Sequence, residues 1–202
     1  MDLNEIINRV ENSPPKIEGI HREFSVLIPL IEVDNRLHVL FEVRSSNLKV
    51  QPNEICFPGG KVEKNESYKE CALRETREEL NIPMDSIDLI GKLDTLVLPY
   101  NLTIYPFCGK INENIEHISY SKDEVSSIFS VPLKFFLDKN PDTYNTHIKV
   151  YTDEQFPHHL ISGGRDYNWR VGTYPVYFYK YNEHIIWGIT AKIIKNFIDI
   201  IK

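Results

Sequence analysis

The sequence predicts an α/β domain in which helices cover both faces of a mixed β-sheet, preceded by a short N-terminal helix. A run of good helix formers at 67–80 lies between apolar, β-branched runs on either side of it. The chain ends in a second amphipathic run at 190–201, which predicts a further helix. We therefore expect a helix and linker at 1–21 and the α/β domain at 22–202.

The first elements read as a helix and a hairpin. Residues 2–11 carry apolar side chains at helical spacing, so this helix is expected to pack on the domain, and Ser13-Pro14-Pro15 ends it as a linker. Two β-branched runs at 24–33 and 37–43 flank Asp34-Asn35-Arg36, which is a turn sequence. The pattern predicts a β-hairpin.

The remaining strands are expected after the helix at 67–80. Residues 87–98 and 102–111 are apolar and are separated by Pro99-Tyr100-Asn101, which predicts two long strands and a turn. Further predicted elements are strands at 128–131, 144–151 and 174–181, and a short helix or turn at 132–137.

Residues 57–82 begin as a turn and become a helix. The Pro58-Gly59-Gly60 sequence lacks one amide donor and lets the backbone approach a ligand closely. Ser67 is predicted to cap the helix, with Glu70 as its capping-box partner. Asn81 adopts the left-handed conformation readily, so the helix is expected to end there.

One face of this helix carries Glu75, Glu78 and Glu79 at i, i+3, i+4 spacing, so the three side chains meet. Like charges repel in that arrangement, and a divalent cation would turn the repulsion into attraction. Mg²⁺ suits the position because it prefers hard oxygen ligands. Arg74 and Arg77 lie beside the stripe and can hold either the carboxylates or an anion. The alternative is a solvated, charged helix face without a ligand.

The spacing of these residues matches a known pattern. Reading from Gly60, the chain follows G-x5-E-x7-R-E-U-x-E-E-x-G-U, where U is apolar, except that Asn81 replaces the second glycine and Thr76 stands at an apolar position. The chain thus resembles the Nudix hydrolase family. The resemblance implies a Nudix-type α/β/α sandwich. It also implies an Mg²⁺ ion, for which Mn²⁺ can substitute, held by Glu75, Glu78, Glu79 and the carbonyl of Gly60.

We call the stretch at 60–82 that follows this pattern the box. The segment ahead of the box resembles one branch of the family. Coenzyme A diphosphatases carry L-L-T-x-R-S-x3-R-x3-G-x3-F-P-G-G there. The matching positions are Leu40, Arg44, Ser45 and 57–60, and the departures are Phe41 for Leu, Glu42 for Thr, Lys49 for Arg and Asn53 for Gly. The resemblance implies Mg²⁺-dependent hydrolysis of the diphosphate of coenzyme A or acyl-CoA, giving 3′,5′-ADP and (acyl-)4′-phosphopantetheine.

Coenzyme A has a 3′-phosphate besides its diphosphate, so protein cations beyond the metal have a role. Arg44 and Lys49 are the candidates for substrate binding, against the alternative that each forms a surface salt bridge. Glu75 and Glu124 are the two candidates for the carboxylate that orients the attacking water or takes its proton.

Three further residues of the box receive roles. Arg74 is placed in the catalytic set, and Glu66 is expected to brace the turn through it. Cys71 lies on the same helix and is interpreted as a small packing residue, with a catalytic thiol as the alternative.

Two other functions stay open. The first is a Nudix hydrolase that acts on another nucleoside diphosphate derivative, such as a nucleotide sugar or a dinucleotide, because the segment ahead of the box matches only in part. The second is a non-catalytic nucleotide-binding module. The intact acidic set argues against that module, because a binder has no need of three carboxylates that repel each other.

Composition restricts the partners. The chain has 202 residues, 42% hydrophobic and 26% charged, and a formal charge of −6, which argues against a nucleic-acid or membrane-surface footprint. We expect a small-molecule substrate, no secretory signal and no membrane span. The three cysteines lack metal-ligand spacing, which indicates a reducing cytoplasm. The sequence gives no indication of the oligomeric state.

Overall fold

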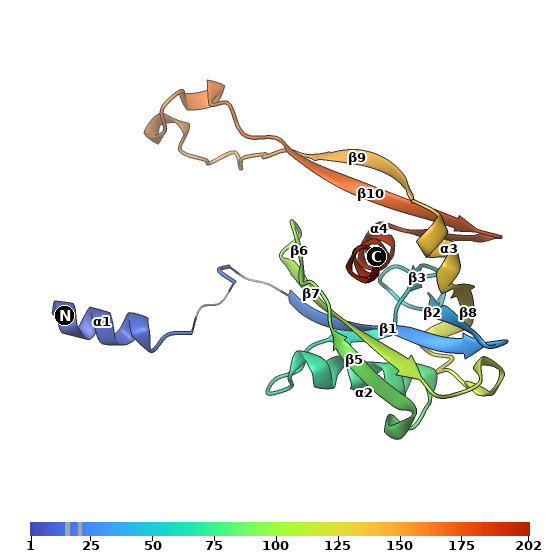
Figure 1. The fold of residues 1–202 in the computed structure, drawn as a ribbon. Coiled ribbons are helices and arrows are strands. Elements are labelled where there is room, and N and C mark those ends of the chain that lie inside the picture. Colours follow the sequence, from blue (N-terminus) through green and yellow to red (C-terminus); the bar gives the residue numbers. More distant parts are fainter. Residues whose placement is uncertain (15–16, 20–21) are drawn as a thin grey trace.

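A mixed β-sheet lies between helix α2 (Tyr68–Leu80) and helix α4 (Gly188–Ile201) in the computed structural model, which describes residues 1–14, 17–19 and 22–202 (Figure 1). Its strands are β1 (Arg22–Val33), β2 (Arg36–Arg44), β3 (Ile55–Cys56), β4 (Gly59–Lys61), β5 (Ile87–Lys92), β6 (Leu96–Leu98), β7 (Leu102–Ile111) and β8 (Val125–Pro132). Helices on both faces of a mixed sheet confirm the predicted fold class.

The sheet is organised around β1. Over the described residues the strand order is β3-β2-β1-β7-β5, with β4 paired to β1, β6 to β7 and β8 to β2. β1 and β7 run parallel, whereas β1 pairs with β2 and β4 antiparallel. The β1–β2 turn is the predicted one: Asp34 and Asn35 have φ values of 49° and 57°, as a two-residue hairpin of type I′ requires.

The alternation of side chains along the strands builds two cores. On the α4 side, Ile28, Val39 and Phe41 pack with the apolar face of α4. On the α2 side, Leu27 and Leu40 pack with the apolar face of α2. Because both faces of β2 are covered, its central residues are buried irrespective of the side to which they point.

Helix α2 forms as the sequence predicts. The Ser67 hydroxyl accepts the N–H of Glu70, and the Glu70 carboxylate accepts the N–H of Ser67, which completes a capping box. At the other end Asn81 has φ 49° and ψ 41°, the left-handed conformation that terminates a helix.

Three predicted elements differ from the structure. The strand expected at 87–98 is two strands, β5 and β6, because the pairing with β7 shifts register between Leu89 and Gly91 and the ladder breaks at 93–95. The strand expected at 128–131 is the longer β8, which pairs along most of β2. The helix expected at 190–201 begins at Gly188, with Trp187 at the N-cap position and no side-chain cap, and the hydroxyl of Thr190 within it donates to the carbonyl of Ile55 at 2.9 Å.

The N-terminal helix α1 (Leu3–Glu11) forms with Asp2 and Glu5 in a capping box, but it stands away from the sheet (Figure 1). None of its residues is buried, so the expectation that it packs on the domain is wrong. The linker expected at Ser13-Pro14-Pro15 and the boundary at residue 21 fall partly outside the described residues, and the division at 21/22 stays a prediction.

The last third of the domain adds a second sheet. Its elements are α3 (Leu133–Asp138), β9 (Asp142–Ile148), β10 (Gly172–Tyr181) and β11 (His184–Trp187), the strands pairing antiparallel in the order β11-β10-β9. The β9–β10 pair projects beyond α4 (Figure 1). Short 3₁₀ helices lie at Met84–Ser86, Ile115–His117, His158–Leu160 and Gly164–Asp166. Among the helices of the described residues, none has the length and apolar content to cross a bilayer.

Candidate functional site

The glycine turn lies directly against α2. β4 places Gly60 opposite Ser25 and Gly59 opposite Val26 on β1. A Cβ atom added to Gly60 would collide with the carboxylate of Glu75, so glycine is required there by a close approach of helix and turn. The Gly-Gly turn and the acidic face of α2 therefore meet at Gly60 and Glu75.

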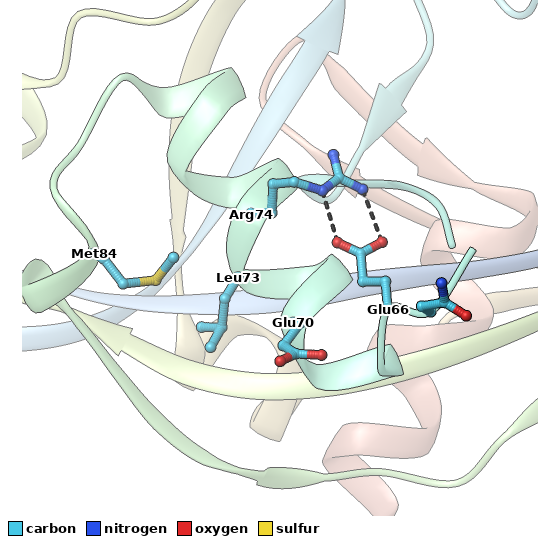
Figure 2. A pocket seen from close by; sticks show the side chains of 6 residues that line it. Glu66, Glu70, Leu73, Arg74 and Met84 are labelled. Atoms are coloured by element: carbon cyan, nitrogen blue, oxygen red, sulfur yellow. Dashed lines mark hydrogen bonds and ion pairs between the residues drawn. The ribbon is translucent and has the colours of Figure 1, made fainter. Parts of the chain in front are cut away.

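Arg74 binds the outer acids of this cluster. Its guanidinium forms a two-bond fork with Glu66, Nε to Oε1 at 2.7 Å and Nη2 to Oε2 at 3.1 Å (Figure 2). Its Nη1 also reaches Glu75 Oε1 at 2.8 Å and Glu78 Oε2 at 3.2 Å. The hydrogen bonds from Arg74 lower the pKa of Glu66 to about 2. The bracing role expected of Glu66 has this geometric support.

Glu79 is held differently, on the sheet side of α2. Only 6% of it is exposed, and its Oε2 accepts the backbone N–H of Gly59 at 2.8 Å. Burial raises the pKa of Glu79, which the Gly59 hydrogen bond only partly offsets, and the nearby Glu75 and Glu124 add to the increase. Glu78, by contrast, is exposed and is shared between Arg74 and Arg77.

The sequence did not single out Glu42, although it belongs to this cluster. It lies on β2 between Cys56 of β3 and Ile128 of β8, and only 1% of it is exposed. Burial raises the pKa of Glu42 well above its usual range, with Glu79 the next largest cause. The available signal was a single carboxylate in an otherwise apolar strand that leads to Arg44.

The structure brings two of the three remaining predicted residues to the cluster. Arg44 follows Glu42 two residues later on β2, after a register shift in the pairing with β8, and its charge acts on the pKa values of both Glu42 and Glu79. Glu124 lies on an exposed turn whose carbonyl accepts the N–H of Ser45 at 2.8 Å, and its charge acts on Glu75 and Glu79. Lys49 is exposed in the loop after β2, and no contact places it at the cluster.

A thiol role for Cys71 has no support in this geometry. Its Sγ lies 3.5 Å from the carbonyl oxygen of Gly60, to which it donates, and the residue is fully buried. Burial raises the pKa of the Cys71 thiol to about 12, so the nucleophilic thiolate is scarce at neutral pH. The packing interpretation fits these observations.

The donor set suits a divalent cation. Across the part of the chain that the structure describes, no three acidic, histidine or cysteine side chains converge as a ready-made metal cage. The acids are held by Arg74 and by the Gly59 amide instead. Hard carboxylate oxygens gathered beside a glycine turn, two of them with burial-raised pKa values, nevertheless match what Mg²⁺ prefers.

A surface hollow with a volume of about 380 Å³ lies on the outer side of α2 (Figure 2). It is lined by Asn65, Glu66, Glu70, Leu73, Arg74 and Met84. It touches the Glu66–Arg74 pair and includes neither Glu79 nor Glu42, so it adjoins the acid cluster without containing its buried part.

Comparison with known proteins identifies the family. The NUDIX domain model matches residues 21–151. The peroxisomal coenzyme A diphosphatase NUDT7 of Mus musculus is 33% identical over 146 residues, which is 72% of this chain but only 56% of the mouse protein, so the chain spans about half the length of that relative. A protein named “Uncharacterized Nudix hydrolase NudL” of Photorhabdus laumondii is 31% identical over 199 residues, 96% of this chain and 95% of that protein.

A solved structure supports the fold. A MutT/nudix family protein from Enterococcus faecalis superposes with a TM-score of 0.51 at 16% identity, covering 100% of this chain and 70% of that one. The domain match over residues 21–151 and the mouse relative, together with the box at 60–82, show that the chain belongs to the Nudix hydrolase family.

Proposed function

We propose that this protein hydrolyses the diphosphate bond of coenzyme A or an acyl-CoA in a reaction that requires Mg²⁺ or Mn²⁺. The products are 3′,5′-ADP and 4′-phosphopantetheine or its acyl form. The observation that carries the proposal is the contact between the glycine turn and the acid cluster, where Glu75 packs against Gly60 and Glu79 binds Gly59.

The residues that would hold the cation are Glu75, Glu78, Glu79 and the Gly60 carbonyl. A divalent cation bound there neutralises charge on the diphosphate and lowers the pKa of a coordinated water. Arg74 keeps Glu75 and Glu78 in place from the outer side, since it donates to both. The backbone N–H of Gly59 fixes the orientation of the Glu79 carboxylate.

Two carboxylates are our candidates for the group that accepts the proton of the attacking water. Glu75 lies beside Gly60, and Glu124 lies on the turn joined to Ser45 at the end of β2. Glu124 is exposed and comes from a loop outside α2, so it can serve as the base without also being a ligand of the cation. Glu124→Gln should then lower kcat with little change in cation affinity, whereas Glu75→Gln should lower both.

We propose coenzyme A over other diphosphates as the substrate for two reasons. The segment at 40–60 follows the pattern of the coenzyme A diphosphatases, and a relative bears that name. We assign Arg44, whose charge acts on Glu42 and Glu79, to a phosphate oxygen of the diphosphate, and Lys49, in the exposed loop after β2, to the separate 3′-phosphate.

A substrate panel tests the proposal. Coenzyme A, acetyl-CoA, ADP-ribose, a nucleotide sugar and a dinucleotide are incubated with Mg²⁺, with Mn²⁺ and with EDTA, and the products are separated by chromatography. We expect the highest kcat/KM with coenzyme A or its thioester, and none in EDTA. Preference for a substrate that lacks pantetheine would favour the nucleoside diphosphate alternative, and nucleotide binding without hydrolysis would favour the non-catalytic module.

A further inference from the structure

Glu42 is buried by the architecture of the sheet. Leu40, two residues earlier on β2, points into the core on the α2 side, and the two-residue period of a strand puts Glu42 on the same face. Helix α2 packs on that face of the sheet, and the charge of Glu79 on this helix acts on Glu42. Glu42 therefore faces the acid cluster from the sheet, while Glu75 and Glu79 face it from the helix.

This buried carboxylate lacks the partners that normally compensate burial. Among the residues that the structure describes, its Oε1 has no hydrogen-bond partner. Of the four charged groups that act on it most strongly, three are the carboxylates of Glu79, Glu124 and Glu75, and the fourth is Arg44. Burying a carboxyl oxygen without a hydrogen bond costs free energy, so a structural role alone leaves its presence unexplained.

We propose that Glu42 is a further residue of the divalent-cation site, supplying a carboxylate oxygen from β2 opposite Glu79 of α2. This rests on the proposed function, because it requires the cation site at the glycine turn. The unpartnered Oε1 then has a ligand to bind. The crowding of Glu42, Glu75 and Glu79 changes from a repulsion into a set of oxygen donors around one positive centre.

Residue 42 is also a position at which this chain departs from the pattern that it otherwise follows. The coenzyme A diphosphatase signature has Thr where this chain has Glu42. A threonine hydroxyl is a neutral donor, whereas a carboxylate adds one negative charge and up to two oxygen ligands. Glu42→Thr and Glu42→Gln therefore remove the charge in two independent ways.

The test measures Mn²⁺ binding to the full chain in the absence of substrate, by electron paramagnetic resonance and by titration calorimetry. We expect Glu42→Gln and Glu42→Thr each to weaken Mn²⁺ binding by about tenfold or more, in the range found for residues that support a metal site. Glu23→Gln is the matched control: Glu23 is a partly buried acid on neighbouring β1, held by the hydroxyls of Tyr68 and Tyr105, and its loss should leave Mn²⁺ affinity unchanged.

Thermal unfolding gives a second readout that a structural role would not reproduce. A ligand that binds only the folded state stabilises it by RT ln(1 + [L]/Kd), so the same excess of free Mn²⁺ should raise the Tm of Glu42→Gln less than that of the wild type. The Tm of the metal-free variant should equal or exceed that of the wild type. Because glutamine is nearly isosteric with glutamate, this variant should fold.

The outcomes separate the two claims. Saturable Mn²⁺ binding that is equal in wild type and both Glu42 variants would overturn the role of Glu42 and leave the proposed function standing. Loss of Tm in metal-free Glu42→Gln with unchanged Mn²⁺ affinity would do the same and indicate a structural residue. A wild-type protein without saturable Mn²⁺ binding would overturn the cation site and, with it, both proposals.

Discussion

The acids on the outer side of α2 and those on its sheet side differ in how their charge is compensated. Glu66 and Glu78 receive the guanidinium of Arg74, which supplies hydrogen bonds and a positive charge. Glu42 and Glu79 are buried; Glu79 accepts one neutral amide, that of Gly59, and Oε1 of Glu42 has no hydrogen-bond partner among the described residues. The charges of Glu66 and Glu78 are thus compensated by Arg74, whereas burial and neighbouring carboxylates make the charged forms of Glu42 and Glu79 unfavourable.

This difference teaches how one helix can serve two purposes. A carboxylate with an arginine partner is stable as it stands and fixes the shape of the turn. A buried carboxylate without such a partner gains most from an external cation. We infer that Arg74 fixes the outer half of the cluster, Glu66 and Glu78. The cation, which we propose also binds Glu75 and Glu78, compensates mainly the charge of the inner half, Glu42 and Glu79.

The largest expected effect breaks the inner half. Glu79→Gln should reduce Mg²⁺-dependent turnover by about a thousandfold or more, because a metal ligand and its charge are lost while the shape is kept. The fold should survive, since the amide can still accept the Gly59 N–H. Turnover under saturating Mg²⁺ and far-UV circular dichroism measure both. Retained activity in a folded variant would remove Glu79 from the ligand set.

The next effect disturbs the contact between the glycine turn and helix α2. Gly60→Ala places a methyl group against the Glu75 carboxylate and should lower kcat by about a hundredfold, the cost of misplacing a reacting group by roughly 1 Å. Gly91→Ala is the control, because a Cβ there meets nothing within 4 Å. Steady-state kinetics of the two variants compare a crowded glycine with an open one, and equal kcat values would contradict the close approach.

A smaller effect weakens the outer half while its charge is kept. Arg74→Lys replaces a planar fork by a point charge that cannot bind Glu66, Glu75 and Glu78 together. We expect a free energy of unfolding lower by about 1–2 kcal/mol, as for loss of charged hydrogen bonds, and kcat lower by about tenfold. Urea unfolding and kinetics report these changes; a variant of wild-type stability would show that the fork is dispensable.

The smallest effect concerns acid pH. Because Arg74 lowers the pKa of Glu66 to about 2, below the unfolded value of about 4.3, the folded state favours the charged form. The stability from this pair is therefore complete above about pH 4.3 and is lost as pH falls towards 2. In metal-free protein, the difference in unfolding free energy between wild type and Glu66→Gln should shrink over that range. Urea titrations at several pH values measure it, and a constant difference would assign the pKa shift no role in stability.

The sequence predicts best where neighbours in the chain decide the structure. The limits of α2 follow from Ser67, Glu70 and Asn81, which cap the helix through contacts within a few residues. Asn53, which replaces glycine in the pattern ahead of the box, has φ 61°, and Asn81 has φ 49°, so both asparagines adopt the conformation that glycine would. The pairing of Glu66 with Arg74 was expected from the resemblance of the box, and the two hydrogen bonds between them fit that expectation.

Non-local pairing decided the features that the sequence did not reveal. The break between β5 and β6 depends on the register of both strands with β7. Helix α1 is exposed because none of the described residues covers its apolar side chains. Glu42 was noticed only as a departure from a pattern, because its burial requires β3, β8 and α2 to close around β2. The cytoplasmic location and the roles of Lys49 and Glu124 stay predictions.

The parallel pairing of β1 with β7 has a consequence for how the protein reaches its folded state. Ser25 of β1 contacts Tyr105 of β7, 80 residues later in the chain, and the whole of α2 lies in between. Closing so large a loop delays the central ladder, so contact order predicts slow folding for this domain. During synthesis the ribosome must release the chain beyond residue 111 before the sheet can close. Until then α2 can pack on β1 and β2, which precede it in the chain, but it lacks the buried contacts that Tyr105 and Phe107 of β7 supply.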